Sequence, residues 1–135
     1  MSESVKVSTV LNATAKEIYT AWLDSKGHAA FTGSAAKVSA KKGSKFTAWD
    51  GYISGKNVAL KPYTRIVQKW RTTEFPEGSP DSNLEILLEQ GKKGTKLTLI
   101  HTEIPDGQAK EYKKGWVDFY FKPMKEYFKG KSNKT

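Results

Sequence analysis

Hydrophobic and polar residues alternate through much of the chain up to residue 104, a pattern typical of strands with one buried face. The alternation predicts a first strand near residues 5–9 and a series of strands and turns over residues 35–104. The turn signals are Asp50-Gly51, expected to form a two-residue hairpin turn, then Pro62, the loop 75–82 and residues 91–94. Together they predict an antiparallel meander.

Helical signals precede and follow this meander. Thr14 and Glu17 form a Ser/Thr-x-x-Glu capping box, which predicts that a helix begins there. Its apolar positions, Ile18 to Leu23, follow helical spacing. A short segment between Gly27 and Gly33 is expected to add about one more helical turn.

The C-terminal segment is expected to form a long helix with a broad apolar face. At ~100° per residue one arc collects large side chains, and a second apolar stripe lies beside it. The arc holds Tyr112, Trp116, Phe119, Tyr120, Pro123 and Tyr127, and the second stripe holds Val117, Phe121, Met124 and Phe128. Pro123 removes a backbone hydrogen bond, so we expect it to bend the helix. Residues 130–135 are expected to be a flexible tail.

These elements describe an α+β domain in which the apolar face of the sheet meets the terminal helix. The 135 residues fit a single domain, 1–135, with one hydrophobic core. No apolar run approaches the roughly 20 residues that span a bilayer, and the first residues lack a signal-type segment. With no cysteine in the chain, we expect a cytoplasmic protein.

The charge of the chain raises the question of nucleic-acid binding, since the formal net charge is +9. Nearly all of the positive charge comes from lysine, because Arg65 and Arg71 are the only arginines. Arginine is the usual bidentate ligand of phosphate and guanine. The lysines are also spread along the chain, so we expect a lysine-coated surface and no nucleic-acid partner.

Catalysis has little support in the sequence. A cysteine nucleophile is absent, and the two histidines, His28 and His101, lie far apart in the chain. No HExxH motif or nucleophile-elbow motif is present. We therefore expect no enzymatic activity, no metal and no cofactor.

Several short stretches, in this order and spacing, resemble one known family. They are Ala30-Phe31-Thr32, Trp49-Asp50-Gly51 with Ser54-Gly55, Arg65-Ile66-Val67 with Lys69-Trp70-Arg71, Pro76-Glu77-Gly78, Thr95-Lys96-Leu97 and Gly115-Trp116. The chain resembles the C-terminal domain of the activators of the 90-kDa heat-shock protein (Hsp90) ATPase, within the START-like, helix-grip group. The resemblance implies a curved antiparallel sheet wrapped around the long C-terminal helix, often with a cavity between them.

Large rings are unusually frequent on the faces expected to point inward. Either these rings fill the core, or they line a pocket in which tyrosine hydroxyls and tryptophan N–H groups contact a bound ligand. The candidate cavity residues are Trp22, Phe31, Trp49, Trp70, His101, Trp116, Phe119 and Tyr120. His101 follows Leu97 and Leu99 on the inward face of its strand. It is either a partner for the polar end of a ligand or a buried neutral histidine with internal hydrogen bonds.

The second stripe of the terminal helix also has two interpretations. Its members Val117, Phe121, Met124 and Phe128 either pack on the N-terminal helices or form an exposed apolar surface for a partner or a second copy. A monomer or a weak dimer is expected.

Two functions remain open from the sequence. The first is a non-enzymatic binding module that holds a small apolar or amphipathic ligand between sheet and helix. The second is a minimal co-chaperone that stimulates the Hsp90 ATPase through its surface, because basic residues are attracted to an acidic partner.

Overall fold

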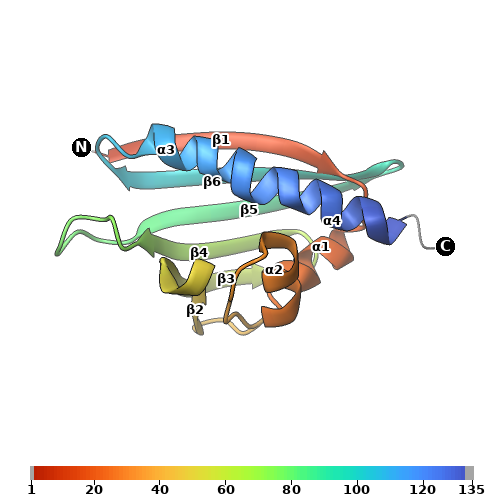
Figure 1. The fold of residues 1–135 in the computed structure, drawn as a ribbon, viewed down its shortest axis with the longest axis horizontal. Helices are drawn as coiled ribbons and strands as arrows, with labels where there is room; N and C mark the ends of the chain where they lie inside the picture. The colour runs from red at the N-terminus through yellow and green to blue at the C-terminus, as the bar shows by residue number, and fades with distance from the viewer. Residues whose placement is uncertain (1, 133–135) are drawn as a thin grey trace.

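Six antiparallel strands form one curved sheet, and a long C-terminal helix lies across its inner face (Figure 1). The structure is a computed structural model that describes residues 2–132, with side chains for residues 3–128. The strand order is β1-β6-β5-β4-β3-β2. The strands are β1 (Ser2–Leu11), β2 (Lys45–Ala48), β3 (Ile53–Lys61), β4 (Arg65–Thr72), β5 (Ser82–Gly91) and β6 (Gly94–Pro105). The α+β helix-grip fold is confirmed.

The register of the neighbouring strands β5 and β6 shows which face of the sheet is buried. Leu88 of β5 pairs with Leu97 of β6, and Ile86 pairs with Leu99. Successive side chains of a strand point to opposite faces, so these leucines and Ile86 share the inner face. All four are at most 6% exposed. The alternation in the sequence therefore located the core face of the sheet correctly.

Two short helices follow β1 and lie beside the C-terminal end of the long helix (Figure 1). In α1 (Ala15–Trp22) the predicted capping box is present: the Glu17 amide donates to Thr14 Oγ1 at 3.1 Å, and the Thr14 amide donates to the Glu17 carboxylate at 2.9 Å. The next helix, α2 (Ser25–Thr32), is longer than the single turn expected. It ends at Gly33, whose φ of 78° is the left-handed conformation that favours glycine.

The long helix contains a wide turn at its centre. It runs as α3 (Ala109–Gly115), a π-helical segment η2 (Trp116–Phe121) and α4 (Lys122–Ser132). The Lys122 amide donates to the Val117 carbonyl, five residues back. Pro123 directly follows, and in a regular α-helix its ring would clash with the Phe119 carbonyl. The wider turn relieves that clash, so the predicted distortion at Pro123 takes this form.

One local prediction, the hairpin turn at Asp50-Gly51, needs correction. The connection between β2 and β3 is an antiparallel hairpin, but its turn includes a 3₁₀ segment, η1 (Trp49–Gly51), and Tyr52. It is therefore longer than the two residues expected from Asp50-Gly51. A flexible tail is expected over residues 130–135; α4 extends to Ser132, residues 133–135 lie outside the described part of the chain, and the flexibility stays a prediction.

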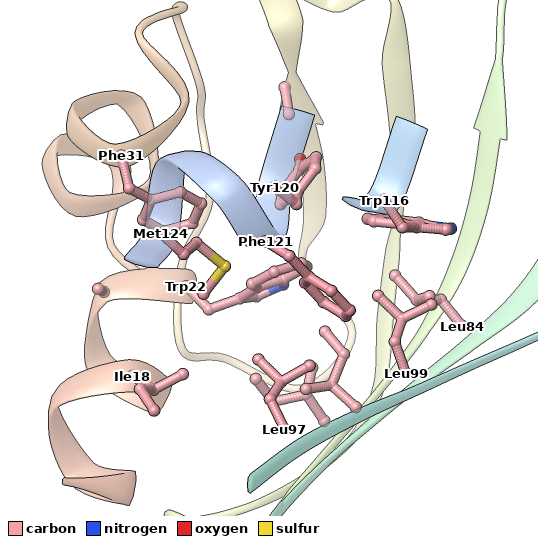
Figure 2. Packing of buried hydrophobic residues seen from close by; sticks show 14 of the residues in the cluster. Ile18, Trp22, Phe31, Leu84, Leu97, Leu99, Trp116, Tyr120, Phe121 and Met124 are labelled. Carbon is pink, nitrogen blue, oxygen red and sulfur yellow. The ribbon is translucent and has the colours of Figure 1, made fainter. Parts of the chain in front are cut away.

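The second stripe of the terminal helix lies in the core. Phe121, Met124 and Phe128 are 4%, 0% and 1% exposed, and α4 contacts α2 and β1. Figure 2 shows Phe121 and Met124 turned inward from the helix, with Trp22 beneath them. Val117, at the start of the π segment, is 36% exposed and is the one member of the stripe outside the core. A partner surface made by this stripe is therefore wrong for its three buried members, which pack on the N-terminal helices and the sheet.

Candidate ligand pocket

A pocket of about 520 Å³ lies between the N-terminal half of the long helix and the β2–β4 side of the sheet. Strand β4 and the η1 turn form one side, and α3 with η2 forms the other. The lining residues are Ser34, Trp49, Asp50, Tyr52, Ile53, Trp70, Glu111, Tyr112, Gly115, Trp116, Phe119 and Tyr120. Phe119, Asp50 and Glu111 are exposed to solvent at its rim, so the pocket is open.

The walls of the pocket are aromatic rings set at large angles to one another. Trp70 and Tyr112 have ring centroids 5.1 Å apart and planes at 83°. Trp116 and Tyr120 are 4.9 Å apart at 55°, and Trp49 and Phe119 are 5.9 Å apart at 70°. Edge-to-face contacts of this kind are favourable between aromatic rings.

His101 lies behind this wall, in a hydrogen-bond chain whose direction is fixed. The Trp116 indole N–H can only donate, so it donates to His101 Nδ1 at 3.2 Å. The proton of the ring is therefore on Nε2, which donates to Ser82 Oγ at 2.7 Å. Ser82 in turn donates to the Trp70 carbonyl at 2.8 Å. Burial lowers the pKa of His101 from 6.5 to about 3. His101 is therefore a neutral, internally bonded histidine that orients Trp116.

His28 supports Tyr120 in the same manner, and sequence reasoning did not select it. Its Nδ1 donates to the Trp22 carbonyl at 2.9 Å, so its Nε2 accepts from the Tyr120 hydroxyl at 2.9 Å. Burial lowers the pKa of His28 from 6.5 to about 4, partly opposed by the bond to Trp22. Burial also raises the pKa of the Tyr120 hydroxyl.

Tyr112 is a third wall residue with fixed orientation. Its hydroxyl donates to the Gln108 side-chain oxygen at 2.7 Å and therefore accepts from Thr72 Oγ1, also at 2.7 Å. Burial raises the pKa of Tyr112. The sequence held a usable signal for this residue, because Tyr112 falls in the same helical arc as Trp116 and Tyr120.

The structure separates the candidate cavity residues into two groups. Five of the eight line the pocket: Trp49, Trp70, Trp116, Phe119 and Tyr120. The others do not line it, and Trp22, Phe31 and His101 are 2%, 3% and 0% exposed. Trp22 and Phe31 pack behind Tyr120, with ring centroids 5.1 and 6.0 Å from its ring. Whether the pocket residues bind a ligand stays a prediction.

Other kinds of site find no support in the described residues. Within residues 2–132, no three His, Cys, Asp or Glu side chains gather to hold a metal ion. In that same part of the chain, no helix has both the length and the apolar character needed to cross a bilayer.

A curved antiparallel sheet that grips a long C-terminal helix defines the START-like, helix-grip class of domain. The chain belongs to the family described as "Activator of Hsp90 ATPase homolog 1-like protein", which matches residues 12–129. It is 32% identical over 114 residues to the human "Activator of 90 kDa heat shock protein ATPase homolog 1", covering 84% of this chain. A Dictyostelium discoideum homologue of that activator is 25% identical over 85% of this chain.

The match covers only part of these relatives. This chain spans 33% of the human protein and 30% of the Dictyostelium protein. Among solved structures, an Hsp90 activator from Plasmodium falciparum superposes with a TM-score of 0.85 at 24% identity, covering 92% of this chain and 94% of that chain. The Aha1 dimer from Colwellia psychrerythraea gives a TM-score of 0.76 at 15% identity, covering 90% and 93%. These structural likenesses concern the fold.

Proposed function

We propose that this chain is a co-chaperone domain that binds an Hsp90-type chaperone and stimulates its ATPase without catalysing a reaction itself. The observation that carries the proposal is the family match over residues 12–129, together with 32% identity to a human Hsp90 ATPase activator. Because the chain spans a third of that activator, the proposal concerns the part of the activity that one domain supplies.

The outer face of the long helix offers a surface for such a partner. Lysines that are exposed along this helix are Lys110, Lys113, Lys114, Lys122 and Lys125. Within the described residues, only Lys122 among them forms an ion pair, with Asp118 at 3.3 Å. A row of exposed ammonium groups favours an acidic partner surface and speeds association at low salt.

The decisive experiment is ATP turnover by the chaperone with and without this protein, at low and at high salt. We expect stimulation that falls steeply as salt rises, because screening weakens interactions between exposed charges. A Lys113→Glu/Lys114→Glu variant should lose most of the stimulation. A Lys92→Glu/Lys93→Glu variant makes the same charge change in the β5–β6 turn, at the other end of the molecule, and should keep it (Figure 1).

Unchanged turnover with an excess of the protein at low salt would contradict the co-chaperone proposal. Equal losses in the two lysine variants would show that net charge, and not the helix face, carries the interaction.

A second candidate function is the binding of a small apolar or amphipathic ligand, and it rests on the pocket. Small-molecule sites commonly measure about 300–1,000 Å³ and are lined by apolar and aromatic side chains. The pocket of about 520 Å³ falls in that range and has a ring-rich lining. Native mass spectrometry of gently extracted protein tests this candidate. A broad ligand screen that shifts no indole signal of Trp70 or Trp116 would contradict it.

A further inference from the structure

The charge of the pocket is opposite to the charge of the whole protein. The chain has a formal net charge of +9, with 23 lysines and arginines. None of the lysines and arginines among residues 3–128 lines the pocket, whose charged lining residues are Asp50 and Glu111. A pocket that selected an anion would be expected to use some of the abundant lysine. This one presents two carboxylates at the rim of an aromatic chamber.

Neither carboxylate is neutralised by a basic side chain in the part of the chain that the structure describes. The ion pairs there join Arg65 to Glu85, Arg71 to Asp81 and Lys122 to Asp118. The side-chain contact of Asp50 is with the Ser34 hydroxyl, which donates to it at 3.3 Å. The two rim carboxylates are therefore available to a positively charged guest.

The aromatic walls suit the same kind of guest. The face of an aromatic ring carries partial negative charge and attracts a cation within about 6 Å of the ring centre. Three of the four tryptophans, Trp49, Trp70 and Trp116, line the pocket. Trp70 and Trp116 are 3% and 2% exposed because they pack on other rings, so the ring surface open to a ligand belongs mainly to Trp49 and to Phe119, which is 59% exposed.

The backbone of the η1 turn keeps an aromatic ring and a carboxylate together at the rim. Trp49 and Asp50 both have positive φ, 53° and 56°. This conformation is tolerated by Asp but uncommon for a bulky residue such as Trp. Strained residues of this kind cluster at binding sites, where the surrounding structure holds them in place.

We propose that the pocket binds a cation with apolar substituents, such as a quaternary or alkylated ammonium group. The ammonium group contacts the rings of Trp49 and Phe119 at the mouth of the pocket, and Asp50 with Glu111 balances its charge. This proposal deepens the ligand-binding candidate above and rests on it, but it is independent of the co-chaperone proposal.

The experiment compares two probes of the same shape and different charge. Choline carries a quaternary ammonium group, and 3,3-dimethyl-1-butanol replaces its nitrogen by carbon. Titration of each into the protein is followed by the NMR signals of the Trp49, Trp70 and Trp116 indole N–H groups. We expect choline to bind at least tenfold more tightly than the alcohol. A parallel titration with N-acetyl-trimethyl-lysine amide tests whether the ammonium group belongs to a free compound or to a lysine side chain.

Matched variants separate the charge of the pocket from its shape. An Asp50→Asn/Glu111→Gln variant keeps the side-chain shapes, and Asn tolerates the positive φ at position 50. It should lose about tenfold in choline affinity and nothing in affinity for the alcohol. A Glu89→Gln/Glu126→Gln variant makes the same charge change at exposed positions outside the pocket, and should bind both probes as the unmodified protein does.

Each remaining outcome counts against a specific claim. Equal binding of choline and the alcohol would overturn the cation proposal and leave the ligand-binding candidate standing. Binding of neither probe would overturn the cation proposal, and the broad ligand screen would then decide the candidate itself. Equal choline affinity in the two double variants would show that the rim carboxylates do not bind the cation.

Discussion

The two halves of the long C-terminal helix make opposite kinds of contact with the rest of the molecule. After the π turn, Met124 and Phe128 are 0% and 1% exposed and fill the space between helix, sheet and N-terminal helices. Around and before that turn, Tyr112, Trp116 and Tyr120 are also buried, at 8%, 2% and 4% exposed, but a pocket of about 520 Å³ remains beside them. One helix therefore contributes both a packed region and an open one.

The difference lies in how the side chains are held. Met, Leu and Phe side chains carry no strong hydrogen-bonding atoms, so they can adjust until the space is filled. The rings of the open region are tied by their polar atoms: Trp116 to His101, Tyr120 to His28 and Tyr112 to Thr72 and Gln108. Rings that are fixed in this way cannot move into the pocket without breaking buried hydrogen bonds.

The largest expected effect is a loss of stability at low pH, which tests the buried hydrogen bonds of the two histidines. His28 and His101 are the only histidines, and their pKa values lie near 4 and 3 in the folded protein. Below pH 6.5 the unfolded chain binds a proton at each histidine while the folded protein does not, so stability falls as pH falls. Both contributions together amount to about 5 kcal/mol between pH 7.5 and 4.5. Above about pH 7.5 the unfolded chain no longer binds these protons, and neither histidine contributes to the pH dependence.

Urea unfolding at a series of pH values measures this loss. Single variants, His28→Gln and His101→Gln, should each remove about half of the pH slope between pH 6.5 and 4.5. A slope that is the same in both variants and in the unmodified protein would contradict the assignment of neutral, buried histidines. Because the slope is compared and not the stability itself, a destabilised variant still gives an answer.

The second effect compares the same substitution in the two halves of the helix. Phe128→Ala removes a ring that is 1% exposed in the packed region, and should lower the free energy of unfolding by about 4 kcal/mol. Phe119→Ala removes a ring that is 59% exposed at the rim of the pocket, and should change stability by less than about 1 kcal/mol. Denaturant unfolding measures both. Similar losses would show that the two halves do not differ in packing.

Most of the fold could be predicted from local signals in the sequence. Alternation located the strands, the Thr14–Glu17 capping box located the start of α1, and Pro62 marked the end of β3. Each of these signals acts within a few residues, so one sequence is enough to interpret it. The π turn was missed because helical spacing of 3.6 residues was applied through Pro123, and one wide turn changes which side chains point inward.

The pocket could be predicted only in part, because it depends on contacts between distant elements. Trp49, Trp70 and Trp116 were candidates as large rings on inward faces. Asp50 and Glu111 were missed, since a carboxylate in a turn or on a helix surface is ordinary until the fold brings the two to one rim. Alternation placed His101 inward, but its role is set by Ser82 and Trp116, which are 19 and 15 residues away in the chain.

The smallest effect concerns Gly115, which lines the pocket. Glycine within a helix costs about 1 kcal/mol relative to alanine, and a Cβ at Gly115 would meet no atom closer than Phe119 at 3.9 Å. Packing therefore does not require glycine there, and Gly115→Ala should raise the stability by up to about 1 kcal/mol while narrowing the pocket. Gly33→Ala is the matched control: with φ at 78° it should lower stability by about 1 kcal/mol. If Gly115→Ala does not raise the free energy of unfolding, the helix itself requires glycine before the π turn. The open space in the pocket would then not be the reason for glycine at this position.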